Sequence, residues 1–220
     1  MNRAEILDAM VQTGLYLVTE DGVAAEERLA AVAQALAGGA RIVQLRDKTT
    51  PRRRLIAEAK RMRELCARNR AAFIVNDDVA VAWLSDADGV HLGQDDLPAE
   101  DARRVLGESK VIGLSISAVL EAEEADRLPV DYIGVGAIYA TPTKTDAELG
   151  GLGLLRTVRG VTKKPLVAIG GIDSTNAAEV FEAGADAVAV VRAVFAQDDV
   201  SSAVAGLLRQ ASIVKRERKG

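Results

Sequence analysis

The sequence predicts a closed (β/α)8 barrel, an α/β fold, formed by a single domain. Short apolar runs alternate eight times with amphipathic stretches along the 220 residues, and no change in composition marks a linker. Apolar residues make up 49% of the chain but aromatic residues only 3%, which suits closely packed parallel strands and helices. Eight such units in this length fit a small barrel. We expect one domain over 1–220, with the barrel core at about 14–210 and a short polar C-terminal tail.

The expected strands are short runs rich in Val, Ile, Leu and Ala, bounded by polar residues or glycine. An apolar run of this length without alternation is typical of a strand that is buried on both faces. Eight runs meet this description: 15–19, 41–46, 72–76, 89–93, 110–115, 131–136, 165–171 and 186–191.

The expected helices lie between these runs and carry apolar residues at helical spacing. In the first, Leu29, Val32 and Leu36 share one face, and Gly38 follows as an end signal. Pro98 suits a first helical turn, where its missing N–H is no loss. The eight stretches are 24–36, 51–70, 79–84, 98–106, 120–126, 152–158, 173–184 and 201–208.

An open doubly wound sheet is the rival fold. Such a sheet would carry a G-x-G-x-x-G turn between a strand and a helix if it bound a dinucleotide. The glycine-containing runs 134–140 and 168–172 lack that spacing, which favours the barrel.

Composition and charge exclude several classes of function. A net charge of −4 argues against a nucleic-acid-binding protein. The start of the chain has no signal-peptide pattern and no run is long enough to span a bilayer, so we expect a cytoplasmic protein. The basic stretch 51–70 is interpreted as the solvated face of a helix, and 215–220 as a frayed tail. Cys66 and Trp83 are expected in the core.

Polar residues follow the expected strands at the point where each strand ends. In a barrel these ends meet at one rim, which is where active sites of this fold lie. The residues expected there are Gln44, Arg46, Lys48, Asn76, Asp77, Gln94 to Asp96, Ser115, Thr141, Thr143, Lys144, Gly170, Gly171 and Arg192.

Two Asp-Asp pairs, at 77–78 and 95–96, stand out among these residues. Two carboxylates with a nearby amide form a hard oxygen site suited to Mg²⁺, and a pyrophosphate could complete its shell. Arg46, Lys48 and Lys144 could face the same anion. One Asp of each pair is assigned to the metal and the other to a helix cap or a supporting role. The alternative is that both pairs are simply turns and caps.

Gly170 and Gly171 precede an expected helix with Asp173 or Ser174 as its cap. Barrels often bind a phosphate on backbone N–H groups after strands seven and eight. We therefore expect a second anion site here, although a plain tight turn is the alternative.

Taken together, six motifs in this order resemble the thiamine-phosphate synthase family over about residues 15–195. The motifs are VQLRDK (43–48), VNDD (75–78), HLGQDD (91–96), GLS (113–115), GVGAIYATPTKTD (134–146) and AIGGI (168–172). The resemblance implies a transferase of thiamine biosynthesis. It would join hydroxymethylpyrimidine diphosphate to hydroxyethylthiazole phosphate and release pyrophosphate, through a stabilised pyrimidine-methyl cation.

The resemblance also implies roles for individual residues. Asp77 and Asp96 match the family's magnesium ligands. The pyrimidine-diphosphate contacts would be Gln44, Arg46, Lys48, Asn76, Ser115 and Lys144. The thiazole-phosphate contacts would be Thr141, Thr143, Gly170, Gly171, Val191 and Arg192. The loop 140–151 has the polar, glycine-containing character of a lid.

Two positions depart from the family pattern. Arg192 stands where many members have Ser, and Ile116-Ser117 stands where a small residue and His are common. The single histidine, His91, is interpreted as a structurally satisfied residue rather than a general base.

Three alternative functions are compatible with the sequence. A thiazole tautomerase would keep the phosphate end without needing the acid pairs. Another phosphate-binding barrel enzyme would not need Gln44, Arg46 and Lys48 beside those pairs. A non-catalytic barrel that binds thiamine precursors would bind one ligand without turnover. The expected partners are small-molecule substrates, with neither nucleic acid nor membrane, and a homo-oligomer is compatible with the sequence.

Overall fold

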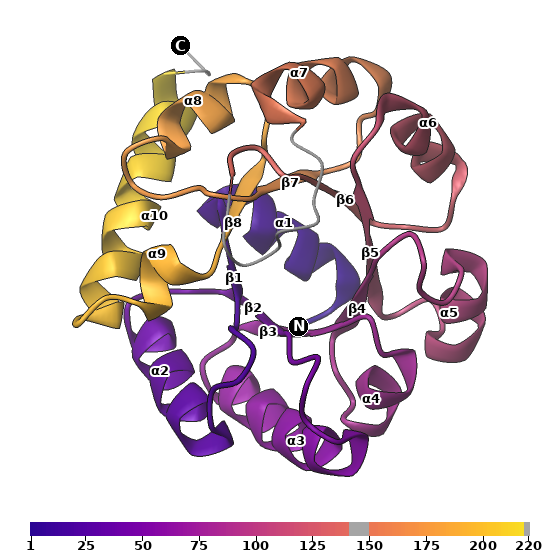
Figure 1. The fold of residues 1–220 in the computed structure, drawn as a ribbon, viewed down its shortest axis with the longest axis vertical. Coiled ribbons are helices and arrows are strands. Elements are labelled where there is room, and N and C mark those ends of the chain that lie inside the picture. The colour runs from indigo at the N-terminus through magenta and orange to yellow at the C-terminus, as the bar shows by residue number, and fades with distance from the viewer. Residues whose placement is uncertain (141–149, 218–220) are drawn as a thin grey trace.

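The structure, a computed structural model, describes residues 1–140 and 150–217, and these form the predicted (β/α)8 barrel. All eight strands are parallel and follow one another in chain order around the barrel (Figure 1). Strand β1 pairs with β2 on one side and with β8 on the other, which closes the sheet. The strands are β1 (Leu15–Val18), β2 (Ile42–Leu45), β3 (Ala72–Asn76), β4 (Gly89–Leu92), β5 (Val111–Ile116), β6 (Tyr132–Val135), β7 (Leu166–Ile169) and β8 (Ala187–Val190). Each lies on a predicted run.

The helices surround the strands as an outer ring, apart from the first. They are α1 (Arg3–Thr13), α2 (Ala25–Ala37), α3 (Arg52–Arg68), α4 (Val79–Leu84), α5 (Ala99–Leu106), α6 (Val119–Arg127), α7 (Gly151–Val161), α8 (Ala177–Glu182), α9 (Arg192–Phe195) and α10 (Val200–Glu217). The eight predicted helices correspond to α2–α8 and α10. Helices α1 and α9 were not predicted.

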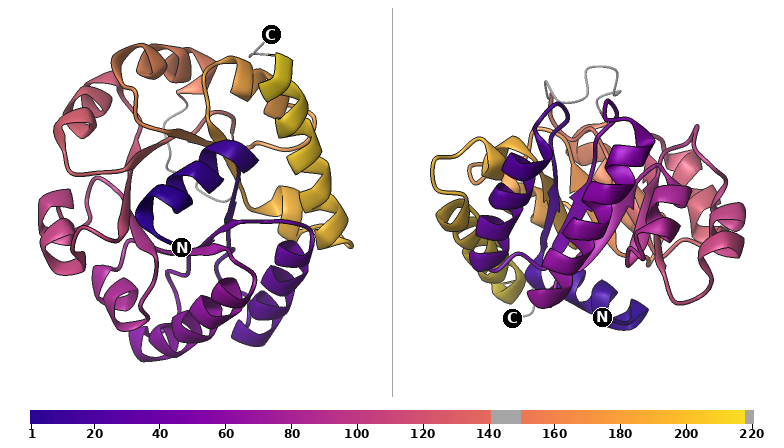
Figure 2. Two further views of the ribbon diagram at one scale, coloured as in Figure 1. Left: turned by 180° about the vertical axis from the view of Figure 1, so that it is seen from behind. Right: turned by 90° about the horizontal axis from the view of Figure 1, so that it is seen from below.

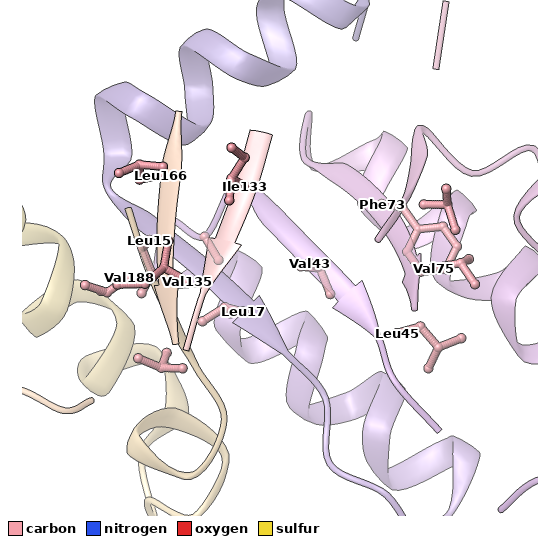
Figure 3. Close-up of a cluster of buried hydrophobic side chains, with 14 of the residues drawn as sticks. Leu15, Leu17, Val43, Leu45, Phe73, Val75, Ile133, Val135, Leu166 and Val188 are labelled. Carbon is pink, nitrogen blue, oxygen red and sulfur yellow. The ribbon is translucent and has the colours of Figure 1, made fainter. Parts of the chain in front are cut away.

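Alternation along the strands sorts the side chains into two layers. Leu15, Leu17, Val43 and Val188 belong to the cluster between strands and helices, part of which is drawn in Figure 3. Their chain neighbours Tyr16, Val18, Ile42 and Ala187 belong to a second cluster inside the barrel. Because successive side chains of a strand point to opposite faces of the sheet, every second residue near the carboxyl end of a strand faces the barrel interior.

Helix α1 covers the amino-terminal end of the barrel (Figure 2). Ile6 and Met10 are buried and pack with the interior cluster. The Asn2 side chain accepts from Glu5 N and the Glu5 side chain accepts from Asn2 N, which is a complete capping box. The barrel interior is therefore closed at this end and accessible only from the opposite rim, as far as the described residues show.

Two sequence-based expectations about helices were wrong. Trp83 is 62% exposed on α4, because the short helix turns Val79, Val81 and Ala82 inward instead. The segment from Lys215 to Glu217 is not a frayed tail but the last turn of α10, which extends well beyond residue 208. Lys215 Nζ donates to the backbone carbonyls of Val11 and of Asp186, the latter at 2.7 Å, so it fastens α10 to α1 and to the start of β8.

Two other expectations are confirmed. Cys66 is fully buried in the core. On α3 the apolar residues Leu55, Ala59 and Met62 are buried while the arginines at 52–54 are exposed. In the part of the chain that the structure describes, no helix combines the length and apolar character needed to cross a membrane.

Candidate active site

A cavity of about 1060 Å³ opens at the carboxyl ends of the strands. Eleven of the fourteen predicted site residues line it, which brings together side chains from all parts of the chain. They are Gln44, Arg46, Lys48, Asn76, Asp77, Asp96, Ser115, Gly170, Gly171, Val191 and Arg192. The other three, Thr141, Thr143 and Lys144, and most of the expected lid lie outside the described residues.

The carboxyl groups of Asp77 and Asp96 meet in this cavity. Burial raises the pKa of Asp77, and the adjacent Asp96 carboxyl raises it further, while Lys48 lowers it. Asp77 has a left-handed φ of +63°, and its backbone N donates to His91 O at 2.7 Å, which joins the end of β3 to β4. Asp96 Oδ2 accepts from Gly93 N at 2.6 Å.

These two carboxylates fit a divalent cation, because a cation between them would relieve their mutual repulsion. Among residues 1–140 and 150–217, no group of three or more His, Cys, Asp or Glu side chains is placed to hold a metal. The pair would therefore supply two ligands and leave the others to phosphate oxygens and water. That is how Mg²⁺ is usually bound beside a phosphorylated substrate.

The neighbouring aspartates in the sequence, Asp78 and Asp95, have separate roles. Asp78 is the N-cap of α4 and accepts from Val81 N at 3.0 Å. It also accepts from Arg52 Nε at 2.6 Å. Asp95 is exposed. Each of the two Asp-Asp sequences therefore contributes one carboxylate, Asp77 or Asp96, to the acid pair in the cavity. The other aspartate of the first sequence, Asp78, caps a helix.

The cations beside the acid pair are held by an aspartate that the sequence analysis did not include. Asp21, in the loop after β1, forms an ion pair with the Arg46 guanidinium and accepts from Lys48 N at 2.9 Å. Lys48 Nζ then lies 3.3 Å from Asp77 Oδ2. An acidic residue shortly after a barrel strand was the available signal, since loops after strands meet at this rim.

A buried ion cluster supports the loop that carries Arg46 and Lys48. Arg28 on α2 lies between Asp47 and Glu58, with distances of 2.6 Å and 2.8 Å. Asp47 Oδ1 also accepts from the backbone N atoms of Thr49 and Thr50. These contacts hold the pKa of Asp47 well below its usual range, against the effect of burial, whereas burial raises the pKa of Glu58. The cluster fixes the chain between the two cations.

A chain of hydrogen bonds crosses the barrel interior below the rim. Gln44 Nε2 donates to Tyr16 OH at 2.8 Å, and Tyr16 OH lies 2.8 Å from Tyr132 OH. Tyr132 OH lies 2.9 Å from His91 Nδ1, and His91 Nε2 lies 2.8 Å from Ser115 Oγ. We call these five residues the floor chain. His91 is thus structurally satisfied, as expected, yet it also lines the cavity.

The opposite side of the cavity is formed by backbone after β7 and β8. Gly170 and Gly171 have φ of +108° and +61°, which favours glycine at both positions. A Cβ at Gly171 would lie only 2.7 Å from Ala140 O, so the chain here packs too closely for any side chain. Asn176 Nδ2 donates to Gly171 O at 2.9 Å and steadies the turn. Val191 and Arg192 continue this wall after β8.

Comparisons with known proteins show the family of the chain. The family model described as "Thiamine monophosphate synthase" matches residues 15–194. The chain belongs to the thiamine-phosphate synthase family. It is 45% identical over 210 residues to the thiamine-phosphate synthase of Chloroflexus aurantiacus, covering 94% of this chain and 97% of the relative. It is also 45% identical to the enzyme of Methanosarcina barkeri, with 84% of each chain covered.

Solved structures support the family and the fold. The thiamine phosphate pyrophosphorylase of Pyrococcus furiosus superposes with a TM-score of 0.83 at 37% identity, covering 92% of this chain and 97% of that one. At 14% identity, the (S)-3-O-geranylgeranylglyceryl phosphate synthase of Thermoplasma acidophilum superposes with a TM-score of 0.71, which shows the fold alone. The family's members are transferases of thiamine biosynthesis, and this chain has thiamine-phosphate synthase activity. The Chloroflexus and Methanosarcina relatives are thiamine-phosphate synthases, so they favour the synthase over the three alternatives: a thiazole tautomerase, another phosphate-binding barrel enzyme and a non-catalytic barrel.

Proposed function

We propose that the rim cavity condenses 4-amino-5-hydroxymethyl-2-methylpyrimidine diphosphate with hydroxyethylthiazole phosphate by a Mg²⁺-assisted dissociative substitution. The observation that carries this mechanism is the contact between the acid pair and Lys48, 3.3 Å from Asp77. A carboxylate pair beside two cations suits a magnesium–diphosphate group, which carries both kinds of charge.

Asp77 and Asp96 would hold the Mg²⁺. When bound, the ion would neutralise charge on the leaving diphosphate, which is the main electrostatic demand of a dissociative reaction. Arg46 and Lys48 contribute fixed positive charge on the same side, and Asp21 keeps them in place before the substrate arrives. By its place in the family motif, Lys144 is proposed as a third cation.

The bond changes need no nucleophilic or strongly basic side chain. The C–O bond between the pyrimidine methylene and the diphosphate breaks, and its electron pair leaves with the pyrophosphate. The thiazole nitrogen then donates its lone pair to the methylene carbon and forms the new C–N bond. The protein's part is to orient both substrates and to stabilise the separating charges.

Each substrate would use a different side of the cavity. Gln44, Asn76 and Ser115 are proposed to contact the pyrimidine half, close to the acid pair. Gly170, Gly171, Val191 and Arg192, with Thr141 and Thr143 by their motif positions, are proposed to bind the thiazole phosphate. Support comes from the backbone N–H groups and close-packed glycines of this wall, which suit a phosphate. The Arg192 side chain would add positive charge at this wall of the cavity.

Pyrophosphate release from purified protein tests the proposal. We expect release only when both substrates and Mg²⁺ are present, with thiamine phosphate as the second product and no release in EDTA. Equal release in EDTA would exclude the role of the metal. Release without the thiazole phosphate would show a hydrolase instead.

A cytoplasmic location is proposed as well, because highly charged substrates do not cross a bilayer unaided. A homo-oligomer stays a prediction, which light scattering checks.

A further inference from the structure

The floor chain links two residues that are proposed to touch the substrate. Gln44 on β2 begins it and Ser115 on β5 ends it, and both line the cavity. The three residues between them, Tyr16, Tyr132 and His91, come from β1, β6 and β4. Tyr16 and Tyr132 are 1% and 0% exposed, so both phenol side chains are buried at the bottom of the cavity that they help to line.

Space for this chain is built into neighbouring strands. A Cβ at Gly113 would lie 2.1 Å from Tyr132 Cζ and 2.6 Å from His91 Nδ1. A Cβ at Gly134 would lie 2.9 Å from His91 Cε1. Any larger residue at either position would displace the rings, so the interior of the barrel accommodates this arrangement specifically.

Each phenol in the chain carries one proton and can donate one hydrogen bond. Burial raises the pKa of both Tyr16 and Tyr132, which keeps both hydroxyl groups protonated. Since Gln44 Nε2 donates to Tyr16, the Tyr16 proton is left for Tyr132, its other partner within the described part of the chain. The Tyr132 proton is then left for His91 Nδ1.

This order fixes the tautomer of the imidazole. A ring nitrogen that accepts a hydrogen bond carries no proton, so the proton of neutral His91 lies on Nε2. Nε2–H then donates to Ser115 Oγ, and the hydroxyl proton of Ser115 remains available for a ligand. At the other end, Gln44 keeps its carbonyl oxygen as an acceptor.

We propose that Tyr16, Tyr132 and His91 are positioning residues that give the floor of the site a fixed polarity. Ser115 is set as a hydrogen-bond donor and Gln44 Oε1 as an acceptor towards the pyrimidine half of the substrate. An amino-substituted heteroaromatic ring fits this polarity, because its amino group donates and its ring nitrogen accepts. The proposal rests on the proposed function only in identifying the ring; the polarity itself follows from the contacts.

The tautomer can be measured directly because His91 is the single histidine of the chain. Long-range ¹H–¹⁵N spectra of ¹⁵N-labelled protein without a histidine tag report which ring nitrogen carries the proton. We expect the Nε2–H tautomer in the wild type and a mixture in Tyr132→Phe, which removes only a hydroxyl group. The Nδ1–H tautomer, or a doubly protonated ring, in the wild type would overturn the proposal.

Kinetics provide the second readout. In Tyr132→Phe we expect kcat/KM for the pyrimidine diphosphate to fall about tenfold, as for the loss of one oriented hydrogen bond, with an unchanged KM for thiazole phosphate. Ser85→Ala is the matched control, because it removes a buried hydroxyl that, in the described part of the chain, donates to backbone carbonyls of α4. If Tyr132→Phe does not fold, Tyr16→Phe interrupts the chain one link earlier and is expected to give the same mixture of tautomers.

The outcomes separate this proposal from the proposed function. An unchanged tautomer and unchanged kinetics in both tyrosine variants would overturn the positioning role even in an active synthase. An Nε2–H tautomer in a protein without synthase activity would keep the polarity and contradict the proposed function instead.

Discussion

Lys48 Nζ lies 3.3 Å from Asp77 Oδ2, and this contact joins the cationic and acidic halves of the site. Burial and the adjacent Asp96 carboxyl raise the pKa of Asp77, whereas Lys48 lowers it. Among the residues that the structure describes, Lys48 is the one cation in an ion pair with these acids, which leaves their charge incompletely balanced. Mg²⁺ and a diphosphate together would balance both the acids and the surrounding cations.

Asp96→Asn is expected to lower turnover by about 100-fold or more and to raise the Mg²⁺ concentration needed for half-maximal rate, as for loss of a stabilising electrostatic contact. The amide can still accept from Gly93 N, so the local turn should survive. Initial rates across a Mg²⁺ titration measure both effects. Asp101→Asn on the surface of α5 makes the same charge change away from the cavity and serves as the control. Full activity of Asp96→Asn at low Mg²⁺ would contradict the metal assignment.

Asp77→Asn is expected to change the pH dependence of stability. The folded protein raises the pKa of Asp77 above its unfolded value of about 4, so the folded state keeps the Asp77 proton to a higher pH than the unfolded state does. The stability of the wild type in EDTA therefore falls as the pH rises from the unfolded pKa of Asp77 through its raised pKa in the folded protein. The variant lacks that decline. Asn also tolerates the left-handed backbone at this position.

Melting temperatures of both proteins in EDTA from pH 4 to pH 8 test this prediction. The variant's melting temperature should gain on that of the wild type as the pH rises. A difference that stays constant over the whole range would show that the folded protein does not raise the pKa of Asp77.

Asp21→Asn is expected to weaken the pyrimidine side of the reaction without unfolding the protein. Asp21 holds both Arg46 and Lys48 N, and its loss should let the two cations move away from the diphosphate. We expect kcat/KM for the pyrimidine diphosphate to fall about tenfold, the size of one charge-assisted hydrogen bond, with KM for thiazole phosphate unchanged. Glu26→Gln removes a comparable carboxylate that pairs with Arg61 on the surface. Equal effects of the two substitutions would mean that Asp21 acts only through net charge.

Arg28→Met is expected to destabilise the fold strongly. It would leave the carboxylates of Asp47 and Glu58, which are 1% and 4% exposed, without their shared cation. Removing one partner of a buried ion pair typically costs about 3–5 kcal/mol. Urea denaturation measures this loss. Arg61→Met removes an exposed arginine and should change the midpoint little; a similarly small shift for Arg28→Met would show that the buried cluster does not stabilise the loop.

The strands and most helices could be predicted because their signals are local. An apolar run such as 72–76 fixes a strand through burial alone, and the barrel then orders the ends of all eight strands. Helix α1 was missed because only Ile6 and Met10 are buried, so its apolar pattern is weak and its burial depends on the barrel that it closes. Trp83 was assigned to the core by residue type, whereas the path of the six-residue helix α4 decides which of its sides faces out.

The rim residues could be predicted because charged and amide side chains at the end of an apolar run are conspicuous in the sequence. Tyr16 and Tyr132 did not, since a tyrosine within an apolar run resembles any other core residue. Strand parity was the signal that could have found them: the alternation that turns Gln44 inward also turns Tyr16, His91 and Tyr132 inward. The position of Asp21 just after a barrel strand was a signal for the rim, but its contacts with Arg46 and Lys48 depend on the course of two loops, which no local pattern specifies.

The most direct test of the acid pair is the affinity of the wild-type protein for the pyrimidine diphosphate alone, measured by calorimetry with Mg²⁺ and with EDTA. If Asp77 and Asp96 hold a magnesium–diphosphate group, binding should be at least tenfold tighter with Mg²⁺, and Asp77→Asn should lose this difference. Equal affinity in Mg²⁺ and in EDTA would contradict the account, because the acid pair would then repel the diphosphate rather than bind it through a metal.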